Sequence, residues 1–524
     1  MALVTYLIGP CSGGASILVD FDSSSLPAVN GNYYLTFTGG TTQGCYDIID
    51  NAEGKNITPS VVEFTSAKSF LVGEEAKGQI GIMDENIAKE VKRSMGSVTT
   101  EYNFFGETHT PTTISALILK KLKDDAEKAY GEIDSAVVTV PANFANEARE
   151  ATQTAAEMAG LKVDFIINEP TAAAFAYAFQ SGQDLSGTFV IYDLGGGTFD
   201  CSIAKIIGQD VEILSSEGVS KLGGKDFDDE IIRLVAEKYK SETGNDLDKN
   251  EFTSNDAEKL KKTLTSRDKA TAKILGKVIP ISREEFESAI SNLILQTELA
   301  VETALSRLDL KHSDITDVIL VGGSTRIPAV QESIKNIFKR EAKLFGNPDE
   351  SVALGAAIYA AYKSDSSKLN PLQKQAISKI SVSESAPHYF GTLTMSQNSS
   401  LGKLEEVNSI IIPKDERIPC SITESYYTMS DNQTGVNCRV TQAATEETDP
   451  QFVSIIWEGH LDIKGGRPAG QEIKVTYSYT EDGRMNASFL DVGSGNAKDI
   501  DLSNKSEKSN QDIDEFDIDQ FKVE

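Results

Sequence analysis

The sequence predicts an α/β region followed by an antiparallel β domain, and two patterns in the order of its apolar residues support this fold class. From about residue 55 to 362, short runs rich in β-forming residues, such as 135–140 and 188–193, precede helix-patterned segments such as 283–308. This alternation is typical of α/β folds with buried sheets. Beyond a polar stretch, apolar residues occupy every second position over 473–479, which is typical of a strand with one buried face.

The length and charge of the chain narrow its class. With 524 residues, of which 40% are hydrophobic and 25% charged, the chain is long enough for several domains. It carries 50 Lys and Arg against 79 Asp and Glu, a formal net charge of −29. Nucleic-acid binding and docking on anionic membranes depend on clustered Lys and Arg, so this charge argues against both kinds of partner.

Cysteines and histidines are scattered along the chain. The five cysteines and four histidines show no spacing typical of a structural zinc site, and no disulfide framework is expected, although a bridge between Cys11 and Cys45 stays open. The start of the chain lacks the basic stretch of a secretory signal, and no run approaches the roughly 20 apolar residues of a membrane helix. We therefore expect a cytoplasmic protein.

Composition and periodicity divide the chain into five segments. Residues 1–50 contain no Lys or Arg and are rich in Gly, Ser, Thr and β-formers, so they predict a small β-rich module or a replacement for the first strands of the next domain. Residues 51–364 are expected to form the α/β domain, 365–380 a polar linker and 381–496 an antiparallel β domain. Residues 497–524 are acidic and predict a disordered tail.

The strongest local motif is a glycine turn after a buried strand. The strand ends in Asp193 and is followed by Gly195–Gly197, Thr198 and Asp200. Glycines let backbone N–H groups surround phosphate oxygens where a Cβ would collide. The two aspartates are suited to a hydrated Mg²⁺, and the threonine hydroxyl to a terminal phosphate. The alternative is a structural turn between two strands, flanked by solvated carboxylates.

Two further glycine pairs repeat this pattern. A β-rich run ends at Gly322, Gly323 and Ser324, which suggests duplicated halves around one nucleotide. Gly223 and Gly224 are a third candidate for close backbone approach, with a helix-start turn as the alternative. The helical stretch 258–262 alone is typical of a solvated face.

Together these segments resemble the heat-shock protein 70 (DnaK-type) chaperone family, within the actin-like ATPase superfamily. Over about residues 50–362 the matching segments are NITPSVVEF, AVVTVPANF, IINEPTAAAFAY, IYDLGGGTFD, KLGGKDFD, DVILVGGSTRIPAVQ and NPDESVALGAA. More diverged matches continue through SAPHYFGTLTM, IIIPKDERIPC and TMSDNQTGV. The resemblance implies a two-lobed actin-like ATPase domain with ribonuclease H-like halves, followed by an antiparallel peptide-binding β-sandwich.

The resemblance also implies roles for individual residues. The implied catalytic residues are Lys92, Glu169, Asp193, Thr198 and Asp200, with Asp193 and Asp200 holding Mg²⁺ through water. The residues implied to bind the cofactor, ATP or ADP, are Gly40, Thr41, Thr42, Gly195, Gly196, Gly197, Gly223, Gly224, Glu258, Lys261, Thr265, Gly322, Gly323, Ser324, Arg326 and Asp349. The residues implied to bind peptide are Met395, Tyr426, Met429, Val436 and Cys438, for which ordinary sandwich core is the alternative. Pro141 and Arg149 fall where the family relays the nucleotide state.

Three departures from the family pattern affect these expectations. The family's first phosphate loop has no full sequence match in this chain. Residues 38–42 are the most similar segment, with Thr38 in place of the catalytic aspartate, and residues 19–24 are a weaker alternative that lacks the glycine. A neutral threonine supplies no charge to the metal shell, so we expect hydrolysis to be weakened more than binding. The interdomain linker is not recognisable, which puts coupling in doubt. No helical lid follows the sandwich, so we expect weak, fast-exchanging peptide binding.

The sequence thus predicts a heat-shock protein 70-like chaperone that binds ATP–Mg²⁺ and extended apolar segments of unfolded proteins, with weakened ATP hydrolysis. The resemblance implies J-domain and nucleotide-exchange co-chaperones as partners. The alternative is a non-catalytic nucleotide-binding scaffold, or a co-chaperone-like component of a larger assembly, viral assemblies included, attached through residues 1–50.

Overall fold

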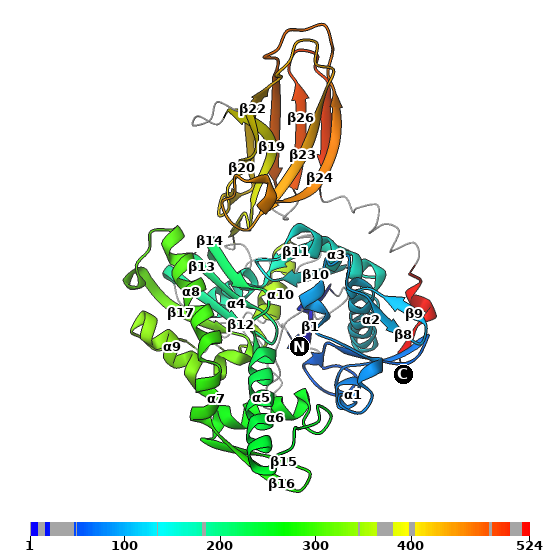
Figure 1. Ribbon diagram of the computed structural model, residues 1–524, viewed down its shortest axis with the longest axis vertical. Helices are drawn as coiled ribbons and strands as arrows, with labels where there is room; N and C mark the ends of the chain where they lie inside the picture. Colours follow the sequence, from blue (N-terminus) through cyan, green and yellow to red (C-terminus); the bar gives the residue numbers. More distant parts are fainter. Residues whose placement is uncertain are drawn as a thin grey trace, which may run out of the picture. The chain divides into compact units, whose positions relative to one another are not determined.

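The computed structural model describes residues 2–8, 16–20, 47–48, 50–133, 135–180, 185–343, 346–363, 381–397, 404–480, 485–502 and 516–523. The chain folds into two compact units, each described by itself (Figure 1). The first comprises Met1–Glu212, Ser216–Ser381 and Ser509–Glu524, and the second comprises Ile213–Ser215 and Val382–Lys508. The expected linker at 365–380 lies outside the described residues, as do Cys11 and Cys45.

The first sheet of the first unit has the order β11-β10-β2-β1-β3. Its strands are β11 (Val163–Asn168), β10 (Ser135–Val140), β2 (Ser16–Asp20), β1 (Ala2–Ile8) and β3 (Asp47–Ile48). β10 is parallel to both β11 and β2, whereas β1 is antiparallel to β2. The described strands of the first 50 residues therefore belong to the same sheet as β10 and β11.

A second sheet repeats this arrangement. Its order is β17-β12-β13-β14, formed by β17 (Ile315–Val321), β12 (Ser186–Leu194), β13 (Phe199–Ile207) and β14 (Asp210–Val219). β12 is parallel to β17 and antiparallel to β13, as β2 is parallel to β10 and antiparallel to β1. Each sheet thus has a strand with one parallel and one antiparallel neighbour.

Two helices pack together between these sheets. α10 (Ser351–Lys363) contacts β1, β2 and β10, and α4 (Glu169–Gln180) contacts β12 and β13. The helices approach very closely, because a Cβ added at Gly355 would lie 1.6 Å from the carbonyl oxygen of Ala172. This contact needs glycine on α10 and joins the two halves of the unit.

Outer elements complete both halves of the first unit. One half carries β4 (Thr58–Pro59), β5 (Val61–Ser66), β6 (Ser69–Val72), α1 (Glu74–Gly78), β7 (Ile87–Lys89), β8 (Tyr102–Phe104), β9 (Glu107–His109), α2 (Pro111–Tyr130) and α3 (Asn146–Met158). The other carries α5 (Gly224–Thr243), α6 (Ser254–Ser266), β15 (Lys269–Ile274), β16 (Lys277–Ser282), α7 (Arg283–Ala289), α8 (Ser291–Arg307) and α9 (Pro328–Phe338). Among the described helices none is long and apolar enough to cross a membrane.

The second unit contains two four-stranded antiparallel sheets. One has the order β20-β19-β23-β24, from β20 (Leu404–Ile412), β19 (Tyr389–Gln397), β23 (Gly435–Ala443) and β24 (Ser454–Asp462). The other has the order β22-β25-β26-β27, from β22 (Cys420–Tyr427), β25 (Glu472–Tyr479), β26 (Met485–Asp491) and β27 (Ala497–Asp501). A short pair, β18 (Ser381–Ser385) and β21 (Arg417–Ile418), accompanies them. Both sheets contribute to one apolar core.

The described parts of 497–524 differ from the expected disordered tail, whereas residues 503–515 and 524 of that tail lie outside the described residues. Residues 497–501 form β27 and pair with β26. Phe516–Val523, which we call the returning segment, contains a short 3₁₀ turn and β28 (Lys522–Val523) and packs on the first unit. Acidic residues outnumber basic ones in this stretch, but its apolar side chains are what the first unit buries.

Candidate functional site

The three glycine turns singled out in the sequence meet in the first unit. Gly195 N donates to Thr198 O at 3.2 Å and closes the turn between β12 and β13. From the start of α5, Gly224 N donates to Gly195 O at 2.9 Å. From the turn after β17, the Ser324 hydroxyl donates to the same Gly195 oxygen at 2.9 Å. Residues far apart in the sequence therefore enclose a single glycine loop.

Two of these positions leave no room for a side chain. A Cβ on Gly223 would lie 2.6 Å from Gly196 C and Gly197 N. A Cβ on Gly322, which has a φ of +77°, would lie 2.5 Å from Leu194 O. Glycine at these positions lets three backbone segments approach closely, as a backbone cradle for phosphate requires.

Two aspartates flank the glycine loop. Asp193 and Asp200 occupy paired register positions in β12 and β13 and are 5% and 2% exposed. Thr198, between them in the sequence, is also buried. Two carboxylates beside a glycine loop fit a Mg²⁺ that keeps several waters. No group of three His, Cys, Asp or Glu that could hold a metal occurs in the described part of the chain.

A buried ion pair lies in the same unit. Lys92 belongs to the 3₁₀ turn Val91–Ser94, and Glu169 is the first residue of α4. Lys92 Nζ lies 2.7 Å from Glu169 Oε1, and each side chain is about 1% exposed. Removing two charges from water is costly unless they pair, so the contact between these two side chains offsets the cost of burying them.

Arg93, next to Lys92, connects this turn to the glycine loops. Its Nε donates to Gly197 O at 3.0 Å, and its guanidinium binds the Asp226 carboxylate through both Nη atoms. Asp226 Oδ2 in turn accepts from Gly223 N at 2.8 Å. No motif in the sequence points to this arginine, and its one local signal is that it directly follows Lys92.

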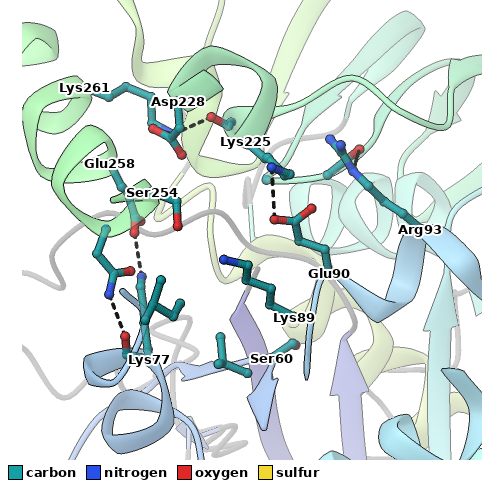
Figure 2. A pocket seen from close by; sticks show the side chains of 16 residues that line it. Ser60, Lys77, Lys89, Glu90, Arg93, Lys225, Asp228, Ser254, Glu258 and Lys261 are labelled. Atoms are coloured by element: carbon teal, nitrogen blue, oxygen red, sulfur yellow. Dashed lines mark hydrogen bonds and ion pairs between the residues drawn. The ribbon is translucent and has the colours of Figure 1, made fainter. Parts of the chain in front are cut away.

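A cavity opens beside the glycine loops, between α1 and β7 of one half and α5 and α6 of the other (Figure 2). Five of the predicted cofactor-binding residues line it: Gly196, Gly197, Gly224, Glu258 and Lys261. Figure 2 shows the Lys77 ammonium directed across the cavity toward Glu258, and Nζ and Oε2 are 2.7 Å apart. Asn255 Nδ2 also donates to Lys77 O, at 2.6 Å. These contacts join the two walls.

Cations outnumber anions on the cavity wall. Its lining includes five basic residues, Lys77, Lys89, Arg93, Lys225 and Lys261, against three acidic ones, Glu90, Asp228 and Glu258. In a chain with a net charge of −29, this local excess of positive charge favours an anionic ligand.

Burial and ion pairing shift two carboxyl pKa values in the cavity. Burial opposes ionisation of Glu258, but Lys77, Lys262 and Lys261 together outweigh it and lower the pKa to about 2. Burial raises the pKa of Asp228 to about 6, although Lys261 Nζ lies 2.9 Å from its Oδ1. Lys261 also donates to Gly224 O at 2.7 Å, so it links α6 to the start of α5.

The remaining predicted residues do not line this cavity. Arg326 donates to Asn347 Oδ1 at 2.6 Å and to Asp349 Oδ2 at 3.0 Å, so this pair fixes the turn after β17 to the segment before α10. Thr265 donates to Lys261 O within α6. The others absent from the lining are Lys92, Glu169, Asp193, Thr198, Asp200, Gly195, Gly223, Gly322, Gly323 and Ser324. Thr38, Gly40, Thr41 and Thr42 lie outside the described residues.

The two proposed relay residues lie near the ends of β10 and β11. Pro141 directly follows β10 and is buried. Arg149 Nε donates to Phe144 O at 3.3 Å, and Nη2 donates to Asn168 Oδ1. Arg149 therefore ties the loop after β10 to the last residue of β11.

In the second unit, four of the five predicted peptide-binding residues surround one hollow, which we call the sandwich hollow. Met395, Tyr426, Met429 and Val436 line it, and the two methionines are 45% and 49% exposed. The Tyr426 hydroxyl donates to Ser409 Oγ at 2.9 Å. Cys438 instead belongs to the core, and burial raises the pKa of its thiol to about 11.

Comparisons with known proteins agree with this arrangement. The Hsp70 protein family model matches residues 37–103 and 97–524. The chaperone protein DnaK of Thermotoga neapolitana is 38% identical over 495 residues, which cover 90% of this chain and 78% of the relative. The chaperone protein DnaK of Thermosipho africanus is 38% identical over 501 residues, which cover 91% of this chain and 79% of the relative.

Proposed function

This chain belongs to the Hsp70 family of chaperones, and we propose that it binds ATP–Mg²⁺ in its first unit and extended apolar segments of unfolded polypeptides in its second. We place it in the cytoplasm, with J-domain and nucleotide-exchange proteins as partners. The observation that carries the proposal is the meeting of three glycine turns beside a cavity rich in cations.

In the first unit, the glycine loop of Gly195–Gly197 cradles the phosphates of ATP or ADP. Asp193 and Asp200 hold a hydrated Mg²⁺, which when bound neutralises charge developing on the phosphates. Lys261 and Glu258 lie on the cavity wall where the rest of the nucleotide binds. Phosphoryl transfer is catalysed mainly by positioning and charge, and fixed glycine loops with buried charges are suited to that.

For hydrolysis we propose that the buried pair of Lys92 and Glu169 acts on the attacking water. Lys92 positions the attacking water and the γ-phosphate, and Glu169 keeps Lys92 ionised and orders the water. Water attacks phosphorus as the bond to the β-phosphate oxygen breaks, giving ADP and inorganic phosphate. The Thr198 hydroxyl donates to the transferred group.

For the first phosphate loop we favour the residues directly after β2 over the competing placement at Thr38–Thr42. Asp20 ends β2, as Asp193 lies near the end of β12, and each strand has one parallel and one antiparallel neighbour. Val19 is paired with Val138 of the parallel strand β10, and Asp193 is paired with Val321 of the parallel strand β17. These shared neighbours support Asp20 as the counterpart of Asp193, although the antiparallel neighbour precedes β2 in the chain and follows β12.

Two substitutions separate these placements. Asp20→Asn is expected to lower ATP turnover about 10²–10³-fold, as loss of one charged group at a transition state does, while calorimetry still detects ATP binding. Thr38→Asp is expected to leave turnover unchanged. Unchanged turnover in Asp20→Asn together with raised turnover in Thr38→Asp would support the loop at 38–42.

The main test of nucleotide function is phosphate release by the purified full chain, with ATP affinity measured in parallel by calorimetry. Asp193→Asn and Thr198→Ala should lower turnover at least about tenfold. Asp210→Asn is the matched control, since Asp210 is an exposed aspartate at the start of β14. Equal turnover in all three variants would refute the catalytic assignment.

A non-catalytic nucleotide-binding scaffold is the second candidate. It is favoured by residues 21–24, which follow β2 and contain no glycine. Binding of ATP without phosphate release by the unaltered chain would establish this candidate, whereas measurable release that depends on Asp193 would exclude it.

A further inference from the structure

The edge of β6 in the first unit is covered by residues that follow the second unit in the sequence. The sheet order is β28-β6-β5-β7, so β6 would be an edge strand without β28. β28 runs parallel to β6, with Lys522 paired to Ser69 and Val523 paired to Phe70. Lys522 N donates to Lys68 O at 2.9 Å. This is strand addition, in which backbone hydrogen bonds supply affinity and side-chain pockets supply specificity.

An aromatic anchor accompanies the added strand. Phe521 is 6% exposed and belongs to the core of this half of the unit. Its ring meets Phe70 with centroids 6.5 Å apart and His109 with centroids 5.9 Å apart. Phe516 stacks on Phe521 from within the returning segment, at 5.1 Å. A buried aromatic ring of this kind is the usual energetic centre of a recognition site.

Charges on the two sides are complementary. Lys68 Nζ lies 4.8 Å from the centre of the Phe521 ring, and Lys120 Nζ lies 3.9 Å from Asp519 Oδ1. Within the returning segment two aspartates, Asp517 and Asp519, outnumber one lysine, Lys522, and both of these contacts bring a lysine of the first unit to the segment. The exposed ion pair adds little affinity, but it favours an acidic ligand over a basic one.

We propose that the first unit carries a second peptide-binding site, separate from the sandwich hollow, that recognises a short acidic segment with an aromatic anchor. The site is formed by the edge of β6 with Lys68, Phe70, His109 and Lys120. The returning segment of the same chain occupies it. The first unit runs to Ser381 and resumes at Ser509, so the returning segment belongs to the first unit although it follows the second unit in the sequence.

Amide hydrogen exchange on the full chain tests the occupancy. In the unaltered protein the Lys522 amide should be protected, and Phe521→Ala should speed its exchange by more than about tenfold, because truncating a buried Phe removes its packing. Gln520→Ala is the matched control, since Gln520 is exposed and donates only within the segment. Protection of β5 and β7 in the variant confirms that the unit is still folded. Equally fast exchange at Lys522 in all three proteins would overturn the proposal.

A labelled peptide of residues 511–523 tests recognition. It should bind the Phe521→Ala protein more tightly than a control peptide in which alanine replaces the phenylalanine of position 521. It should bind the unaltered chain at least about tenfold more weakly than the Phe521→Ala protein, because the chain's own segment competes at high effective concentration. Equal binding to both proteins would show that the site is open, and binding to neither would show that it does not recognise the segment; either result would overturn the proposal. If the Lys522 amide were protected only in a dimer that forms with rising concentration, the occupant would be the segment of a second copy. That result would also overturn the proposal.

Discussion

Lys92 Nζ and Glu169 Oε1 are 2.7 Å apart, and each of the two side chains is about 1% exposed. The two residues come from different elements, a 3₁₀ turn and the first position of α4, so their contact joins segments 77 residues apart. A single unpaired charge at this depth is expensive, whereas the pair is tolerated.

Lys92→Met should therefore destabilise the first unit by about 3–5 kcal/mol, the range expected when one partner of a buried pair is removed. Circular dichroism at the helix band reports mainly on this unit in urea unfolding, because the second unit is built of strands. Trp457, the single tryptophan, lies in β24 of the second unit, so its fluorescence is an internal control that should not change.

The double variant Lys92→Met/Glu169→Gln is the matched comparison. It replaces the buried carboxylate with a neutral amide and should recover part of the lost stability. If the double variant were as unstable as Lys92→Met alone, lost packing rather than an unpaired charge would be responsible.

Lys77→Ala should weaken the closure of the cavity, since Lys77 on α1 reaches Glu258 on α6 at 2.7 Å. The side chains are 19% and 10% exposed, so we expect about 1 kcal/mol, which corresponds to roughly fivefold faster nucleotide release. Release of a fluorescent ATP analogue into excess ATP measures the rate. Lys262→Ala is the control, because Lys262 binds the same Glu258 from within α6 at 3.0 Å and does not cross the cavity. Equal acceleration by both variants would contradict the cross-cavity explanation.

The lowered pKa of Glu258 predicts a specific dependence of stability on pH. Its pKa falls from an ordinary 4.5 to about 2 in the folded chain, since the three lysines outweigh its burial. The folded state therefore binds fewer protons than the unfolded state between these values, and the stabilisation is complete above pH 4.5 and is lost as the pH falls toward 2. Glu258→Gln should cost at most about 3 kcal/mol at pH 7, and the difference from the unaltered chain should shrink below about pH 4.5. A difference that stays constant from about pH 7 to about pH 3 would disprove the ionic origin.

Gly223→Ala should abolish tight nucleotide binding while leaving the second unit intact. The new Cβ would lie 2.6 Å from the backbone of Gly196 and Gly197, so the glycine loops must move apart. We expect at least about a hundredfold loss of ATP affinity by calorimetry, since misplacement of about 1 Å is costly at such sites. Gly78→Ala is the control: a Cβ added there would have no atom within 4 Å, so the affinity of this variant for ATP should be unchanged.

The glycine turns could be predicted from the sequence because each is a local pattern, in which glycines directly follow a strand. It could not reach Lys77 or Arg93, because what brings them to the cavity is the packing of α1 and η2 (Val91–Ser94) against distant elements. It treated 283–308 as one helix, whereas the structure has two, because Ile290 is fully buried with a ψ of 1° between α7 and α8. The helical spacing of apolar residues continues through Ile290, so the sequence gives no sign of the break between α7 and α8.

The expected disordered tail failed for a related reason. Net charge is an average over a segment, and a few apolar residues within it decide whether the segment docks. Phe516 and Phe521 supply that apolar surface, and the segment packs on the edge of β6. No local sequence pattern predicts that this edge is available.

The methionines of the sandwich hollow should govern peptide affinity. Met395 and Met429 are about half exposed on its wall, and neither is needed to fill the core. Large exposed apolar side chains beside a hollow are typical of a binding surface, and methionine adapts to varied partners.

Met395→Glu and Met429→Glu should each lower the affinity for an extended apolar peptide by more than about tenfold, because the carboxylate loses water when peptide binds. Fluorescence anisotropy of a labelled apolar peptide measures this. Ile455→Glu places the same charge on an equally exposed residue of β24 outside the hollow and should leave affinity unchanged. A comparable loss in all three variants would mean that overall charge, rather than the hollow, sets the affinity.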